Sequence, residues 1–330
     1  MNGKPVFTVP GRVINFDSGF KHKLLCDGPT FSTGTACVYS CSFCYVPSVM
    51  KKLVGDPGDK FPLKHEEMVI RRRDAVNTVL SQLTDADGRP KFNDPNDRRV
   101  IYASPLVDVA ANMELIRETV DVCREILELT HWQIRLLSKS NLLPEIAKRL
   151  ADFPYDNISW PVTEKDVKER MIFGVSTGTL NDELAGAFEE DTPKVSKRIK
   201  SLHWLQDNGF RTFGMICPSL PQNDYECFAR EMSAAIRVDR CEHVWAEVMN
   251  VRGESFVRTI KALSNVGYGQ EAYRLAEVSK EKAAWEEYAR ATFLAHSHFI
   301  PPTKLRFMQY VTKDNRSWWD QHKHLGAVLL

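Results

Sequence analysis

Three of the eight cysteines in this chain of 330 residues fall close together. Cys37, Cys41 and Cys44 lie in the segment GTACVYSCSFCYVP and have the spacing C-x3-C-x2-C. This spacing lets one short loop bring three thiolates to a single iron–sulfur cluster, for which cysteine thiolates are the usual ligands. Three thiolates leave one iron of a four-iron cluster without a protein ligand. An open metal position is where substrate chemistry takes place.

A structural zinc site and an electron-transfer cluster are the alternatives for these thiols. Structural zinc needs four ligands, usually as two spaced pairs, and electron-transfer clusters usually take a fourth cysteine. The sequence has no second C-x2-C, and its other cysteines are scattered: Cys26, Cys123, Cys217, Cys227 and Cys241. A non-catalytic iron–sulfur or zinc-binding protein with a redox or structural role therefore remains the alternative to an enzyme.

Composition excludes several other classes of protein. The 44 basic and 43 acidic residues nearly cancel, which argues against a strongly basic nucleic-acid binder. The N-terminus has no continuous apolar region, and no run of about 18 apolar residues occurs. We therefore expect a soluble, cytoplasmic protein that does not enter a membrane. Without a secretory signal, metal ligation and buried thiols are favoured over a disulfide framework.

The first hundred residues contain few regular elements around the cysteine segment. Residues 1–33 are rich in turn formers, with a β-like run from Pro5 to Val9, and are expected to form an N-terminal cap. A polar segment runs from Lys51 to Lys64. Residues 66–84 are predicted to be helical, with Arg71, Arg72 and Arg73 on a solvated face.

Beyond residue 99, short apolar runs alternate with amphipathic segments. The expected strands are Val100–Ala103, Trp132–Leu137, Met171–Val175, Arg211–Ile216 and His243–Val248. The expected helices cover residues 112–129, 141–151, 224–237, 254–264 and 270–295. A further helix begins with Thr192 as N-cap and Pro193 at N1, and it ends before Gly209. Residues 304–311 alternate in polarity. Trp318 to His324 form an aromatic and basic end that could stack on nucleobases, although packing of the C-terminus against the barrel is favoured.

Strands separated by helices predict parallel βαβ units. With a strand just before Cys37, the series gives an α/β protein with a partial (β/α)6 TIM-like barrel. The expected domains are the cap at 1–33, the barrel at 34–250 and a C-terminal helical extension at 251–330 that packs on the barrel.

Polar or reactive side chains follow or end several of the predicted strands. They are Asp108, Lys139, Ser176, Cys217 and Glu247. Because the carboxyl ends of parallel strands open onto one face of a barrel, these side chains are candidates for an active site. Each also has a structural interpretation: a solvated lysine, a turn-forming serine, a buried thiol, or a carboxylate paired inside the protein.

The cysteine segment resembles the cluster-binding motif of radical S-adenosylmethionine (SAM) enzymes. The resemblance implies that Cys37, Cys41 and Cys44 hold a [4Fe-4S] cluster whose fourth iron is chelated by the amino and carboxylate groups of SAM. It also implies one-electron cleavage of SAM to methionine and a 5′-deoxyadenosyl radical, which abstracts hydrogen from a substrate. A flavodoxin or ferredoxin is the electron donor that such a family implies.

Three further segments are similar to the spore photoproduct lyase-like branch of that superfamily. They are LSKSNLLPEI (137–146), FGVSTGTLNDELAGAFEEDTPKVSKRI (173–199) and LQDNGFRTFGMICPSLP (205–221). The similarity covers roughly residues 34–250, and of its parts the cysteine motif is the most specific. On this resemblance Lys139, Ser176, Arg198 and Asp108 are the candidates for SAM contacts.

The chain departs from the true lyase at one decisive position. The lyase returns a hydrogen atom from a cysteine three positions before the Asp that aligns with Asp108, and this chain has Pro105 there. The candidates for the catalytic group are therefore Cys217, Asp108 and Glu247. The branch analogy suggests a nucleic-acid lesion or a modified base as substrate, whereas the near-neutral charge fits a small molecule or a protein better.

Overall fold

The computed structural model describes residues 4–49, 67–103, 105–155, 160–250 and 253–329. It divides into two compact units. Unit 1 comprises Met1–Ser40, Tyr45–Gly174 and Trp204–Arg211, and unit 2 comprises Cys41–Cys44, Val175–His203 and Thr212–Leu330. The polar segment from Lys51 to Lys64 lies outside the described residues. The predicted domain boundaries at residues 33 and 250 stay predictions.

Unit 1 contains a group of mainly parallel strands. β3 (Thr30–Phe31), β7 (Val100–Ala103) and β8 (Gln133–Ser138) pair in parallel in that order, and β2 (Ile14–Asn15) lies antiparallel to β3. Ile101, Ile134 and Leu136 have no exposed surface. Near-continuous apolar runs of this kind are typical of parallel strands with both faces covered.

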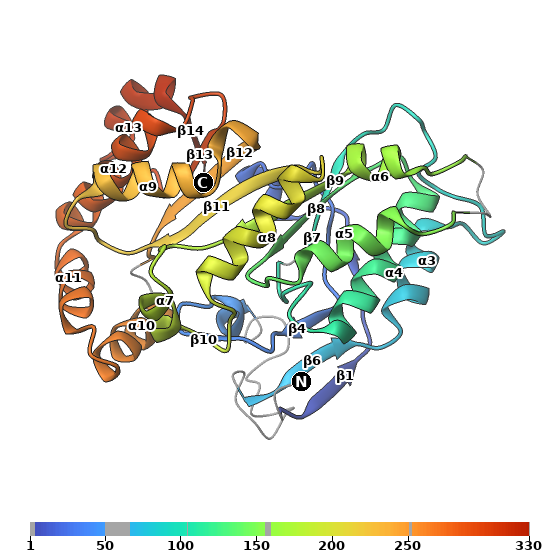
Figure 1. The fold of residues 1–330 in the computed structure, drawn as a ribbon, viewed down its shortest axis with the longest axis horizontal. Coiled ribbons are helices and arrows are strands. Elements are labelled where there is room, and N and C mark those ends of the chain that lie inside the picture. Colours follow the sequence, from blue (N-terminus) through green and yellow to red (C-terminus); the bar gives the residue numbers. More distant parts are fainter. Residues whose placement is uncertain (1–3, 50–66, 104, 156–159, 251–252, 330) are drawn as a thin grey trace. The chain divides into compact units, whose positions relative to one another are not determined.

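The helices of unit 1 pack beside these strands. They are α3 (Ala75–Leu83), α4 (Met113–Leu129), α5 (Leu143–Ala151) and α6 (Glu164–Arg170), and Figure 1 shows α3, α4 and α5 side by side along β7 and β8. Asn112 caps α4 by accepting a hydrogen bond from the Leu115 N–H at 2.9 Å. Helix α6, which the sequence analysis did not predict, begins with a capping box between Thr163 and Asp166.

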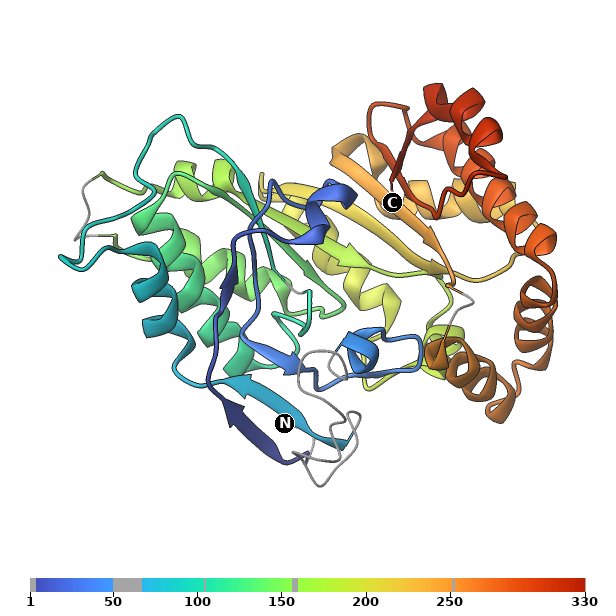
Figure 2. The same cartoon turned by 180° about the vertical axis from the view of Figure 1, so that it is seen from behind.

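The predicted helix over residues 66–84 is wrong in its first part. Residues Val69–Arg72 form strand β6, which pairs in parallel with β1 (Val6–Val9) and antiparallel with β4 (Gly34–Ala36). Figure 2 shows β1 and β6 as neighbouring strands. Three consecutive apolar residues, 68–70, are fully covered, which suits a strand with two buried faces better than a one-sided helix. Arg71 is 5% exposed and pairs with Glu118, so it is not part of a solvated face.

Unit 2 carries four consecutive parallel strands. β11 (Arg211–Ser219), β12 (Cys241–Val248), β13 (Leu305–Met308) and β14 (Ala327–Leu329) pair in this order. Strand β9 (Met171–Ser176) ends in this unit, and the residue after it, Thr177, exchanges backbone hydrogen bonds with Met215 and Cys217 of β11. The α/β architecture with parallel strands and intervening helices is therefore as predicted.

Helices of unit 2 begin close to most predicted positions. The elements are α7 (Asp182–Phe188), β10 (Glu189–Glu190), α8 (Val195–Asp207), α9 (Tyr225–Ala235), α10 (Glu254–Asn265), α11 (Gly269–Lys280), α12 (Lys282–Phe299) and α13 (Arg316–His322). The single helix expected over 270–295 is two, because Glu281 adopts an extended conformation between α11 and α12. Helix α8 starts after its expected cap, and the Thr192 hydroxyl instead contacts the Glu189 carbonyl and Arg198.

The remaining short elements are β5 (Ser40–Cys41) and the 3-10 turns η1 (Gly19–Lys23), η3 (Val238–Arg240) and η4 (Lys323–Leu325). In the tail, Trp319 is 2% exposed and stacks on Phe307, so this part of the tail packs inside unit 2 as expected. Among the described residues, every helix is too short or too polar to cross a membrane.

Candidate functional site

The loop from Cys41 to Cys44 is held inside unit 2 by the end of α7 and by α10. The Ser42 N–H donates to the Phe188 carbonyl at 2.9 Å, and the Ser42 hydroxyl lies 3.0 Å from Thr259 Oγ1 on α10. Phe43 packs on Phe188 with ring centroids 5.7 Å apart. The Cys44 carbonyl accepts a hydrogen bond from Arg258 Nη2 at 2.9 Å. The residues between the two thiols thus fix the loop to the unit.

Cys37 lies in unit 1, directly after strand β4. The two residues that follow it, Val38 and Tyr39, are buried. The ammonium group of Lys4 donates to the Val38 carbonyl at 2.9 Å and to Ser40 Oγ at 2.7 Å. In this unit too, the residues next to the thiol are anchored, while Cys37 itself is half-buried.

The three thiols have the donor chemistry of a cluster site. Each is half-buried and all three belong to one short segment. In the described part of the chain, no three His, Cys, Asp or Glu side chains are grouped so as to hold a metal ion. The cysteines fit a cluster in residue type and in spacing along the sequence.

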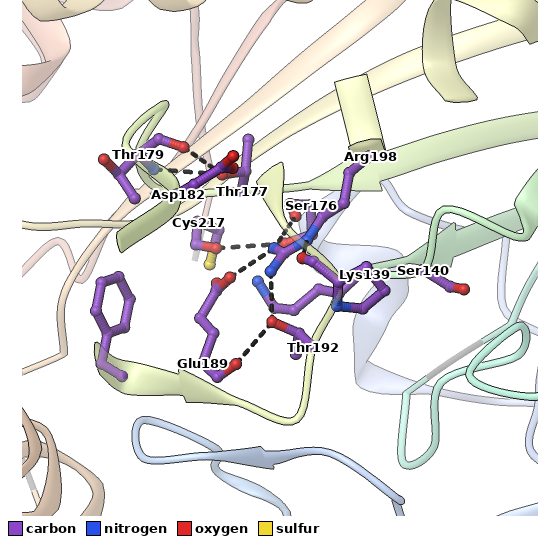
Figure 3. A network of polar contacts seen from close by, with 12 residues as sticks. Lys139, Ser140, Ser176, Thr177, Thr179, Asp182, Glu189, Thr192, Arg198 and Cys217 are labelled. Carbon is purple, nitrogen blue, oxygen red and sulfur yellow. Dashed lines mark hydrogen bonds and ion pairs between the residues drawn. The ribbon is translucent and has the colours of Figure 1, made fainter. Parts of the chain in front are cut away.

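A buried ion pair lies next to Ser176, the last residue of β9 (Figure 3). The guanidinium of Arg198 has no exposed surface, and its Nη1 lies 2.5 Å from Oε2 of Glu189, which is 1% exposed. Nη1 also donates to the Ser176 carbonyl, while Nε donates to the Pro193 carbonyl and Nη2 to the Thr192 hydroxyl. Arg198 thereby joins β10 to the end of β9.

Cys217 and Glu247 are brought together by the adjacent strands β11 and β12. The thiol of Cys217 donates to Glu247 Oε2 at 3.3 Å. The Ser176 hydroxyl donates to the Cys217 carbonyl, also at 3.3 Å. Three of the residues predicted from strand ends, Ser176, Cys217 and Glu247, therefore form one contiguous group in unit 2.

Tyr288 of α12 supports the ends of the same strands. Its hydroxyl donates to the Ser219 carbonyl and accepts from the Met249 N–H. Burial raises the pKa of Tyr288 well above its ordinary value, with smaller contributions from the nearby Cys217 and Glu247. Tyr288 is therefore a neutral hydrogen-bonding group at every physiological pH.

Asp108 serves as a connector within unit 1. Its Oδ1 accepts from Ser138 Oγ at 2.7 Å and the Ala110 N–H at 2.9 Å, and its Oδ2 accepts from the Lys139 N–H at 2.8 Å. Burial raises the pKa of Asp108, although these hydrogen bonds act to lower it. The carboxylate links the loop after β7 to the end of β8 and so fixes the backbone of the half-buried Lys139.

Sequence reasoning missed Glu189, Arg258 and Tyr288. Glu189 lies nine positions before Arg198, outside the spacings that place two residues on one helix face. Arg258 is 214 positions from Cys44, and Tyr288 is 69 from Ser219. The one available signal was Glu189 itself, because a carboxylate next to the apolar Phe188 is expected to be buried and then needs a partner.

Comparisons with known proteins place the fold. No family model matches the chain. Its sequence is 22% identical over 274 residues to "Uncharacterized protein ORF301" of Acidianus two-tailed virus. This match covers 76% of this chain and 77% of that protein.

Solved structures of spore photoproduct lyase are similar in fold. The lyase complexed with dinucleoside spore photoproduct matches with a TM-score of 0.54 and 11% identity, covering 93% of this chain and 82% of the lyase. A double mutant of the lyase with bound AdoMet and dinucleoside spore photoproduct matches with a TM-score of 0.52 and 11% identity, covering 86% of this chain and 77% of the mutant lyase. The chain therefore has the fold of spore photoproduct lyase.

Proposed function

We propose that the chain is a radical SAM enzyme in which Cys37, Cys41 and Cys44 hold a [4Fe-4S] cluster. The observation that supports this proposal is the C-x3-C-x2-C segment on a fold shared with spore photoproduct lyase. When bound, such a cluster supplies the electron that cleaves SAM to methionine and a 5′-deoxyadenosyl radical. A flavodoxin or ferredoxin would deliver that electron.

The candidates for SAM contacts divide into two groups by their surroundings. Lys139 and Ser176 follow or end strands, where active sites of such folds are built, and we assign them to SAM. Arg198 and Asp108 use their polar atoms inside their own units. We therefore assign these two to positioning: Arg198 holds the Ser176 carbonyl, and Asp108 holds the Lys139 backbone.

Among the catalytic candidates, Cys217 and Glu247 are favoured by their contact. A thiol can give its hydrogen atom to a carbon radical, which breaks the S–H bond, forms a C–H bond and leaves a thiyl radical. The Glu247 carboxylate accepts the S–H hydrogen bond and so orients the thiol. This assignment gives the chain a thiol in place of the one that the resemblance would require at Pro105.

Anaerobic reconstitution with iron and sulfide tests the proposed function. We expect a brown protein that forms 5′-deoxyadenosine from SAM when dithionite is added. Cys41→Ala should lose cluster and activity, whereas Cys227→Ala, on the outer part of α9, should keep both. Zinc in the purified protein, or a cluster spectrum unchanged by SAM, would instead support a non-catalytic metal-binding protein. Activity that survives Cys41→Ala would refute the assignment of this thiol to the cluster.

For the substrate class we propose a nucleic-acid lesion or a modified base. The support is the similarity to a lyase whose structure contains dinucleoside spore photoproduct. A salt titration of oligonucleotide binding checks it, because phosphate contacts make affinity fall steeply with salt. Binding that is absent, or that does not change with salt, would favour a small molecule or a protein, as the near-neutral charge does.

A further inference from the structure

Helix α10 supplies a cation to the cysteine loop. Arg258 extends from α10 to the carbonyl of Cys44, which its Nη2 reaches at 2.9 Å. The neighbouring Thr259 meets Ser42 of the same loop, and Phe256 of α10 belongs to the buried cluster on which Phe43 packs. A single turn of α10 therefore supplies the contacts to the loop from Ser42 to Cys44.

The guanidinium of Arg258 has a donor that the loop carbonyl does not use. Its Nε–H is buried and has no hydrogen-bond partner among the described residues. Arginine presents its donors in a rigid fork, so one group can bind the carbonyl and still direct another N–H toward an adjacent acceptor. A buried N–H without a partner is costly, and an anionic sulfur-rich group next to Cys44 would satisfy it.

We infer that Arg258 is a positioning residue for the cluster and also tunes its reduction potential, an inference that rests on the proposed function. The hydrogen bond to the Cys44 carbonyl fixes the loop before any metal binds. The fixed positive charge then favours the more negative, reduced state of a bound cluster, because opposite charges attract strongly in a partly buried site. Arg258 thus makes the cluster easier to reduce without being one of its ligands.

Three variants separate the charge from the hydrogen bond and from general effects on α10. Arg258→Gln removes the charge and shortens the donor, and Arg258→Lys keeps the charge but loses the fork. Lys261→Gln is the matched control, because it removes an exposed cation from the same helix.

The first measurement uses the metal-free protein. Amide hydrogen exchange of the peptide covering residues 41–46 should become several-fold faster in Arg258→Gln, part of this increase should be reversed in Arg258→Lys, and Lys261→Gln should match the wild type. Unchanged exchange in Arg258→Gln overturns the positioning role, whether or not the protein takes up a cluster.

The second measurement uses the reconstituted holoprotein. The midpoint potential, followed by electron paramagnetic resonance during a reductive titration, should move to more negative values in Arg258→Gln at unchanged iron content. Arg258→Lys should lie between that variant and the wild type, a pattern that a purely structural role does not produce. Equal potentials in all four proteins overturn the tuning role. A wild type that binds no cluster refutes the proposed function separately, and the tuning role with it, whereas exchange in the metal-free protein still decides the positioning role.

Discussion

Replacing Arg198 by methionine tests whether the buried pair with Glu189 stabilises the fold or binds the cofactor. Methionine approximates the length of the arginine stem but removes the charge and all its donors. Arg198 has no exposed surface and Glu189 is 1% exposed, so the variant leaves a carboxylate inside the protein without its guanidinium. The contacts to Pro193, Thr192 and Ser176 are lost at the same time.

The expected cost follows from the burial of both partners. Removing one member of a buried ion pair typically destabilises by about 3–5 kcal/mol, because the other charge stays uncompensated. For a chain of 330 residues this corresponds to a decrease in Tm of about 4–7 °C, from the unfolding entropy per residue. The double variant Arg198→Met/Glu189→Leu should recover most of that loss, since it leaves no buried charge.

Urea and thermal unfolding are measured for the wild type, Arg198→Met, Glu189→Leu and the double variant. Together they give the coupling free energy between the two residues. The cofactor is absent from these experiments, so a stability change reports on the fold alone. An Arg198→Met protein that unfolds like the wild type, yet binds SAM far more weakly when reconstituted, would refute the structural assignment and restore Arg198 as a cofactor contact.

Two further predictions concern His296 and Gly178. Burial lowers the pKa of His296 from 6.5 to about 4, so the folded protein binds this proton less readily than the unfolded chain does. The free energy of unfolding therefore falls by about 3 kcal/mol as the pH decreases from 6.5 toward 4. His296→Leu should abolish that part of the pH dependence in urea titrations, and an unchanged slope contradicts the assignment. A Cβ on Gly178 would lie 1.7 Å from the Pro218 carbonyl oxygen, so Gly178→Ala should destabilise by about 1–3 kcal/mol in thermal unfolding. The control Gly186→Ala, where a Cβ meets nothing within 4 Å, should be neutral or stabilising, and equal effects of the two would exclude a steric cause.

Local patterns were sufficient for most of the strands and for the overall class. The apolar runs that become β7, β8, β9, β11 and β12 are short, bounded by polar residues and separated by helical periodicity, so neighbouring residues alone specify them. The segment 66–84 was misjudged because its first apolar residues are buried by pairing with β1, which lies some sixty positions earlier. Burial from distant partners outweighs local helical preference there.

In the candidate site too, some features follow from local patterns and strand order, and others depend on long-range packing. Cys217 and Glu247 end up in contact because adjacent parallel strands align their carboxyl ends, a consequence of topology that strand order makes visible. The partner of Arg198 could not be read from spacing, since Glu189 lies in β10 and Arg198 in α8, with a turn between these elements. Long-range hydrogen bonds such as that from Arg258 to Cys44 depend on packing and leave no local pattern in the sequence.

The residues between the cysteines anchor the motif within each unit. The motif C-x3-C-x2-C leaves the residue types at these positions unspecified, yet in both units these residues are buried or form contacts. Val38 and Tyr39 are buried in unit 1, while Ser42 and Phe43 bind the Phe188 carbonyl and ring in unit 2. The thiols themselves are left half-buried. The side chains between the thiols therefore bear the packing of this segment, those of Val38 and Tyr39 in unit 1 and those of Ser42 and Phe43 in unit 2.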